Sequence, residues 1–340
     1  MKKITTLFLI LSLGLKVSAQ VIEEPGLVKW YTIEQAEELN KKQPRPLYID
    51  MYTDWCGWCK HMMKTTFANQ YIANYINTNF YPVRFDAEGK EPVFFQGKKW
   101  VSQDTARKDS KHELAVYLMD GRMSFPTIVY LLPDGSRAAI PGYKNIKEQE
   151  PLLYYFAEEI NKTAEFGDFE KNFIMSFATD TMPGRIAETS GKVNWLSMNE
   201  ALEAQKKNPK KIYVDVFGSM YVKTRVMDST TYTNPKVAET LNKYFYPVHF
   251  NAASQEKVNF GGKEFVNRGT GAFSLHEFAA YVMGQKIAFS SILFLDETGK
   301  PMNKMEGYFS PKRLNTILKF FGSDAYKTKT WDIFVKENPE

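Results

Sequence analysis

Cysteine is the scarcest chemically reactive residue in this chain, with two among 340 residues. Both lie in one C-x-x-C motif, Trp55-Cys56-Gly57-Trp58-Cys59-Lys60. No second disulfide can therefore form within the chain. A structural zinc ion needs about four ligands, and the remaining candidates offer no second pair at metal spacing. Those candidates are the four histidines, His61, His112, His249 and His276. We therefore predict no metal site.

Long apolar runs are also missing. The longest, Thr6 to Leu15, has about ten residues, whereas a helix that crosses a membrane needs about 20. Lys2 and Lys3 precede this run, and the small residues Val17-Ser18-Ala19 follow it, which is the pattern of a cleaved secretory signal. No cysteine lies near the cleavage site to carry a lipid. We therefore predict a signal peptide at residues 1–19 and a periplasmic or secreted protein that is not embedded in a membrane.

The chain has little excess charge of either sign. Its formal charge of +5 falls to +2 when the three lysines of the signal leave, because 5 − 3 = 2. Basic and acidic residues are mixed along the sequence, so nucleic acid is not an expected partner.

The sequence repeats itself with a shift of 165 positions. The match holds its frame over about seventy residues, which indicates a duplication rather than chance. Matched positions include Trp30 with Trp195, Asp50 with Asp215, His112 with His276, Phe125 with Phe289, and Gly142-Tyr143 with Gly307-Tyr308. We predict a redox-active domain at 20–165, a linker at 166–192 and a degenerate domain without cysteines at 193–340.

Each half alternates strand-like and helix-like segments. Apolar residues at helical spacing predict helices at 30–41, 71–77, 112–119 and 152–160, with another starting at Cys56. Short apolar runs predict strands at 47–52, 81–85 and 127–132. Alternation of this kind predicts an α/β fold, a sheet with helices on both faces.

A C-x-x-C motif at a helix start suits disulfide exchange. The reaction needs one exposed thiol that ionises near neutral pH and a second thiol close enough to form a ring with it. Backbone N–H groups at the helix start would stabilise a Cys56 thiolate, and Cys59 would resolve the mixed disulfide. The alternatives are a stapling disulfide, whose short loop contributes only about 2 kcal/mol, and metal binding.

The stretch from Leu47 to Lys60 resembles the active-site segment of the thioredoxin superfamily, in particular exported bacterial thioredoxin-like proteins with a C-G-W-C-K motif. The resemblance covers about residues 28–160 and implies two tandem thioredoxin-like domains, each a central mixed sheet with helices on both faces. It implies that Cys56 is the nucleophile, Cys59 the resolving cysteine, and Asp50 the buried acid. It also implies that Pro126 is the family's cis-proline. The alternative for Asp50 is a hydrogen-bonded core residue, which the persistence of Asp215 in the second half supports equally.

Four further residues are candidates for substrate binding: Trp55, Gly57, Trp58 and Phe125. The alternative for Trp55 is packing against the fold. The second half departs from the family at every chemical position, because Tyr221, Thr224 and Ser290 replace Cys56, Cys59 and Pro126. It therefore cannot exchange disulfides.

Two functions remain open. The first is a thiol-disulfide oxidoreductase that acts on exported proteins and needs no cofactor. If it reduces its clients, a membrane electron donor must reduce its cysteine pair again. Gly57-Trp58 does not fix the direction. The second is a protein-binding or chaperone-like module whose cysteine pair is structural.

Overall fold

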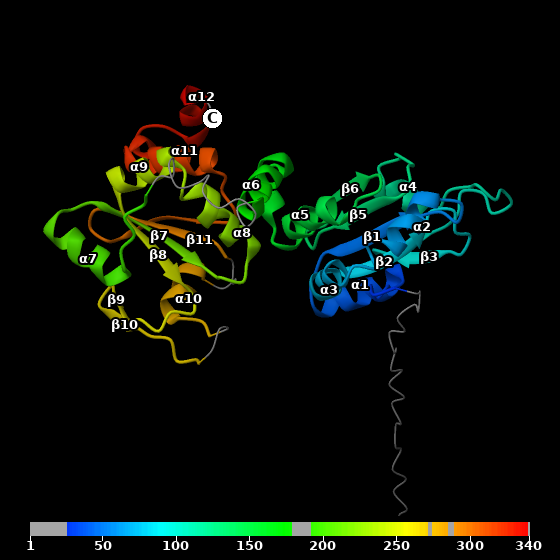
Figure 1. Cartoon of the computed structure of the whole chain (residues 1–340), viewed down its shortest axis with the longest axis horizontal. Helices are drawn as coiled ribbons and strands as arrows, with labels where there is room; N and C mark the ends of the chain where they lie inside the picture. Colours follow the sequence, from blue (N-terminus) through cyan, green and yellow to red (C-terminus); the bar gives the residue numbers. More distant parts are fainter. Residues whose placement is uncertain (1–25, 179–191, 271–273, 285–288, 339–340) are drawn as a thin grey trace, which may run out of the picture. The chain divides into compact units, whose positions relative to one another are not determined.

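The computed structural model describes residues 26–178, 192–270, 274–284 and 289–338. These residues form two compact units, one through Ile146 and one from Lys147 (Figure 1). The signal peptide predicted at 1–19 lies outside the described residues, as does most of the second half of the predicted linker. The predicted domain boundaries stay predictions. None of the helices in the described ranges has the length and apolar character that crossing a bilayer requires.

The first unit is built on a mixed four-stranded sheet in the order β2-β1-β5-β6. β1 pairs in parallel with β2 and antiparallel with β5, which in turn pairs antiparallel with β6. The strands are β1 (Leu47–Tyr52), β2 (Tyr81–Asp86), β5 (Thr127–Leu131) and β6 (Arg137–Pro141), and a separate hairpin joins β3 (Val93–Phe95) to β4 (Lys98–Trp100). The helices are α1 (Ile33–Lys42), α2 (Gly57–Lys64), α3 (Gln70–Asn79) and α4 (Glu113–Leu118).

Both faces of the central strand β1 are covered, because side chains alternate between the faces of a strand. Leu47, Ile49 and Met51 join an apolar cluster with residues of α1 and α4. Tyr48 points to the other face, where its ring lies 6.1 Å from Phe67, just after α2. Asp50 shares that second face by the same alternation, so a carboxyl group is buried on the side of the sheet that α2 covers.

The second unit repeats this architecture. Its sheet has the order β8-β7-β11-β12, with the same parallel and antiparallel pairings. The strands are β7 (Lys211–Phe217), β8 (Phe245–Asn251), β11 (Ser291–Leu295) and β12 (Pro301–Glu306), with the hairpin β9 (Val258–Phe260) and β10 (Lys263–Phe265). Helix α5 (Ile146–Ala157) begins at the last residue of the first unit. The helices that follow α5 are η1 (Ile160–Lys162), α6 (Phe166–Ala178), α7 (Met198–Lys207), α8 (Val222–Val226), the π-helical η3 (Met227–Thr231), α9 (Pro235–Tyr244), α10 (Glu277–Met283), α11 (Pro311–Gly322), η4 (Ala325–Lys327) and α12 (Trp331–Glu337).

Individual contacts recur at the matched positions of the two units. Trp30 packs edge-on against Phe67 at 5.2 Å, and Trp195 packs the same way against Tyr232 at 5.0 Å. The mixed sheet with flanking helices is therefore confirmed, and the two units share one sheet topology.

The structure corrects several element bounds. Helix α1 begins at Ile33 and not at Trp30, because Thr32 and Gln35 form a capping box at its start. Trp30 and Tyr31 are extended, and Tyr31 bridges to Val83. The edge strand β6 was missed because its sequence, Arg137-Ala-Ala-Ile-Pro141, is only weakly apolar and half-buried.

Candidate active site

The cysteine pair lies at the start of helix α2 and forms a disulfide. Cys56 is the N-cap, and its sulfur accepts a hydrogen bond from the backbone N–H of Cys59 at 3.1 Å. N-cap acceptors satisfy helix-terminal N–H groups, and the positive end of the helix dipole favours negative charge there. The position of Cys56 therefore suits a thiolate.

The oxidised cysteines are less accessible than we expected. Cys56 is only 3% exposed and Cys59 1% exposed, so the expectation of an exposed nucleophile is wrong for the disulfide form. The reason is that the Cys56 sulfur is bonded to the buried Cys59 and turned toward its backbone N–H group.

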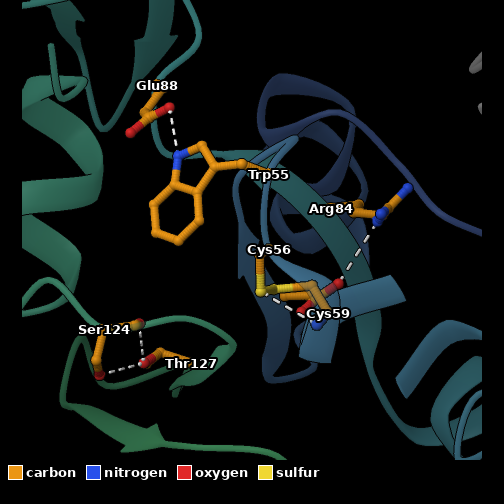
Figure 2. Close-up of a disulfide and its surroundings, with 8 residues drawn as sticks. Trp55, Cys56, Cys59, Arg84, Glu88, Ser124 and Thr127 are labelled. Atoms are coloured by element: carbon orange, nitrogen blue, oxygen red, sulfur yellow. Dashed lines mark hydrogen bonds and ion pairs between the residues drawn. A yellow bond between two sulfur atoms is a disulfide. The ribbon is translucent and has the colours of Figure 1, made fainter. Parts of the chain in front are cut away.

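Two tryptophans beside the disulfide are exposed to solvent. Trp55 is 66% exposed and Trp58 62% exposed. The indole N–H of Trp55 donates to Glu88 at 3.0 Å (Figure 2). The Trp55 ring lies 6.0 Å from that of Phe125. Trp55 therefore does not pack into the core, and Glu88 holds its ring on the same side as Phe125.

Trp58 belongs to a second aromatic group that the sequence did not predict. Its ring lies 5.6 Å from the ring of His61 and 5.4 Å from that of Tyr143. The hydroxyl groups of Tyr143 and Thr65 are 3.3 Å apart. The only sequence signal for Tyr143 was its match to Tyr308 in the repeat, after Gly142.

Asp50 is a buried carboxyl group whose hydrogen-bonding capacity is unmet. It is 1% exposed, and neither of its oxygens has a hydrogen-bond partner within the described residues. Burial raises the pKa of Asp50 to about 7. A carboxyl group with this pKa can accept or release a proton near neutral pH.

Arg84 is the charged residue nearest to Asp50, and sequence reasoning missed it. Its Nε lies 3.5 Å from Asp50 Oδ2, and Figure 2 marks this ion pair with a dashed line. The separation is long for a charge-assisted hydrogen bond, so burial still dominates the pKa of Asp50. The available signal was a cation inside the apolar strand Tyr81-Pro-Val-Arg84-Phe85, opposite Asp50 in the register of β1 and β2.

Pro126 lies at the same end of the sheet as the disulfide. The Phe125–Pro126 peptide bond is cis, as the resemblance implied. Thr127, the next residue, pairs with Met51 near the end of β1 from which the chain continues to Cys56. The Thr127 hydroxyl donates to the carbonyl of Ser124 at 2.8 Å, which fixes the loop around Phe125 (Figure 2).

The described residues contain no group of three or more histidine, cysteine, aspartate or glutamate side chains placed to hold a metal ion.

Comparison with known proteins agrees with this geometry. Residues 33–157 match the family model described as a thioredoxin-like domain. This part of the chain is a thioredoxin-like domain. An uncharacterized protein of Archaeoglobus fulgidus is 28% identical over 94 residues, which are 27% of this chain and 74% of that protein.

Two solved structures are also similar to the chain. The first is a putative disulphide-isomerase from Bacteroides thetaiotaomicron, with 18% identity, a TM-score of 0.30, and coverage of 42% of this chain and 100% of that one. The other is the oxidised C-terminal domain of Neisseria meningitidis DsbD, with 19% identity, a TM-score of 0.25, and coverage of 36% and 88%. Both TM-scores lie below 0.5, so the assignment relies on the family model and the sheet topology.

The second unit offers an internal comparison for the buried acid of the thioredoxin-like domain. Asp215 accepts a hydrogen bond from the Tyr232 hydroxyl at 2.8 Å and another from Ser290, and His249 Nε2 lies 3.4 Å away. Burial raises the pKa of Asp215, and these neighbours oppose that effect. Asp215 is thus a hydrogen-bonded core residue, whereas Asp50 is not. The sequence supports both interpretations of Asp50 equally, and the structure shows that the two acids differ in their hydrogen bonding.

Proposed function

We propose that the thioredoxin-like domain exchanges disulfides with protein clients through Cys56 and Cys59. The observation that carries this proposal is a disulfide at the start of α2 on the sheet face that also holds an unsatisfied carboxyl group, Asp50. A stapling disulfide would need no such acid. Cys56 is the nucleophile, because its sulfur is at the helix N-cap.

In the reducing direction, the Cys56 thiolate attacks one sulfur of a client disulfide. A bond forms between Cys56 and the client, and the other client sulfur leaves as a thiolate and takes a proton. Asp50 then accepts the proton of the Cys59 thiol, and the Cys59 sulfur attacks Cys56. The client leaves as a dithiol with two electrons, and the Cys56–Cys59 disulfide is restored. Oxidation of a client follows the same steps in reverse.

The remaining candidate residues contribute to binding of the client protein. We propose that the client contacts Trp55 and Phe125, whose rings lie 6.0 Å apart, and Trp58, which follows Gly57 between the cysteines. A glycine at position 57 leaves open space, since a Cβ atom there would meet no heavy atom within 4 Å. We also propose that Pro126 contacts the client backbone beside Cys56.

We further propose that the clients are disulfide-containing proteins outside the cytoplasm, reached after cleavage of residues 1–19 in the periplasm or on secretion. If the protein reduces its clients, a membrane electron donor supplies the electrons, since an oxidising compartment has no thiol pool.

The reduction potential of the Cys56–Cys59 pair tests this proposal. The full mature chain is equilibrated in glutathione buffers, tryptophan fluorescence is recorded, and Cys56→Ser serves as the control. A value near about −270 mV would mark a reductase, and one near about −120 mV an oxidant. A pair that stays oxidised below about −300 mV would behave as a structural disulfide and overturn the proposal.

A further inference from the structure

In the second unit, a segment of the chain itself covers the face that corresponds to the redox face. This covering segment, residues 158–177, includes η1 and most of α6. Its helix α6 lies against α8 (Figure 1) and also against η3. The Glu158 carboxylate accepts hydrogen bonds from the backbone N–H groups of Val222 at 2.8 Å and Lys223 at 2.9 Å. These are the first two residues after Tyr221, which replaces Cys56.

Two aromatic side chains of the covering segment, Phe169 and Phe177, pack against residues of that face. Phe169 packs edge-on against Tyr308 at 5.4 Å. The guanidinium group of Arg225 lies 4.4 Å from the ring centre of Phe177. Phe173 lies between them along the helix, 5.8 Å from Phe169 and 4.6 Å from Phe177. Three aromatic residues spaced four apart thus form one stripe of α6.

The backbone of the second unit is shaped for this close approach. A Cβ atom on Gly307 would lie 2.5 Å from the Cγ2 atom of Thr163, so only glycine fits beside the covering segment. Ser229 adds a side-chain hydrogen bond to Ser176 at 2.8 Å.

The positions that hold the covering segment have counterparts in the first unit. The shift of 165 matches Lys223, Arg225 and Ser229 to Trp58, Lys60 and Lys64, and Gly307-Tyr308 to Gly142-Tyr143. An equivalent hydrogen bond at matched positions of both units supports this alignment. The Thr231 hydroxyl donates to the Phe309 carbonyl at 2.9 Å, and the matched Thr66 hydroxyl donates to the Lys144 carbonyl at 2.7 Å.

In the first unit these counterparts are open to solvent. Trp58 is 62% exposed, Lys60 and Lys64 are exposed, and Tyr143 is half-buried, whereas Tyr308 is completely buried. Lys60, Lys64 and Lys144 give this open face positive charge. The covering segment has five acidic and two basic residues, a net charge of 2 − 5 = −3, and so has the complementary sign.

We propose that the client face of the first unit binds an acidic amphipathic helix that carries a stripe of aromatic residues four apart, with the reactive cysteine at the place that Glu158 takes in the second unit. This inference rests on the proposed exchange activity and names its client class. The client is another protein, because the chain's own Phe169 and Phe173 are already buried.

A synthetic peptide with the sequence of residues 158–178 provides the probe. It carries Glu158→Cys, and that cysteine is bonded to thionitrobenzoate. The protein is the reduced full chain with Cys59→Ser. The Cys56 thiolate attacks the peptide sulfur, a Cys56–peptide disulfide forms, and the coloured thionitrobenzoate thiolate leaves, so its absorbance gives the rate. The control peptide replaces Phe169, Phe173 and Phe177 by alanine, which keeps the helix propensity at least as high.

We expect the aromatic peptide to react about tenfold faster than the alanine peptide, since each aromatic contact strengthens docking severalfold. This ratio should fall toward one in Tyr143→Ala and persist in Tyr117→Ala, which removes an exposed ring that packs on Trp100 instead. Equal rates for the two peptides would overturn the inference. The mixed disulfide of glutathione and thionitrobenzoate separates the two hypotheses: if Cys56 does not react with it either, the proposed exchange activity itself fails.

Discussion

Replacing Asp50 by asparagine should change how the stability of the first unit depends on pH. Burial raises the pKa of Asp50 from 3.8 to about 7 in the folded chain. Between these values the folded protein keeps a proton that the unfolded chain has lost. The free energy of unfolding therefore falls as pH rises through this window, and it is highest below the lower pKa.

The size of the effect follows from the two pKa values. One pKa unit corresponds to about 1.4 kcal/mol, so ionisation of buried Asp50 lowers the free energy of unfolding by about 4 kcal/mol between about pH 4 and pH 8. Asparagine has the same shape and does not ionise. The stability of Asp50→Asn relative to the unchanged chain should thus rise by about 4 kcal/mol over that interval.

Native-state hydrogen exchange of the amides in β1 measures this locally, in the oxidised full chain, without requiring that both units unfold together. Asp215→Asn is the matched control. Its carboxylate accepts from Tyr232 and Ser290, so the amide should be destabilising at every pH, and protection of β7 should fall throughout. An Asp50→Asn variant whose relative stability does not change with pH would refute the assignment of a buried, weakly solvated acid.

Three further outcomes are expected. Cys59→Ser should accumulate a mixed disulfide with a client, visible on a non-reducing gel, because no second thiol remains to resolve it. In the unchanged protein, the rate of resolution measured by quenched flow should rise with pH through about 7, as Asp50 becomes the base, and Asp50→Asn should flatten that rise. Tyr232→Phe should destabilise the second unit by about 1–3 kcal/mol in chemical denaturation, since Asp215 loses a hydrogen-bond donor, while the reduction potential of the cysteine pair stays the same.

Much of the fold could be predicted because the strands that form its centre are strongly apolar. β1 and β5 are buried along almost their whole length, so their sequences are mostly apolar, with Asp50 the one charged residue in either strand. The hairpin of β3 and β4 and the edge strand β6 are half-exposed and contain lysine, arginine or alanine, so no periodic pattern marks them. The start of α1 depended on a capping box, and the spacing of apolar residues does not locate such a cap.

The residues of the site whose chemistry requires a particular residue type could be predicted from the sequence. The residues that belong to the site only because the fold brings them near it could not. Cys56, Cys59 and Asp50 are recognisable along the sequence from their spacing. Glu88 is about thirty residues away from Trp55 in sequence and meets it only because β2 lies beside β1. The same is true of Tyr143 and Trp58, which lie far apart in the sequence of the first unit. Contacts of this kind follow from strand order, which the sequence pattern alone left open.

The two copies together constrain the meaning of the buried acid. A buried carboxyl group without hydrogen bonds costs several kcal/mol when ionised, and the second unit shows that this fold can satisfy one: Tyr232 and Ser290 both donate to Asp215. In the first unit, Phe67 and Pro126 stand at those two positions, and neither side chain can donate a hydrogen bond. The copy that keeps both cysteines is therefore also the copy whose acid lacks hydrogen-bond donors among the described residues, and burial raises the pKa of this acid to about 7. If Asp50 were only a structural residue, hydrogen-bond donors like those of the second unit would stabilise the fold. If Asp50 accepts the proton of Cys59, the same donors would lower its pKa and make it a weaker base.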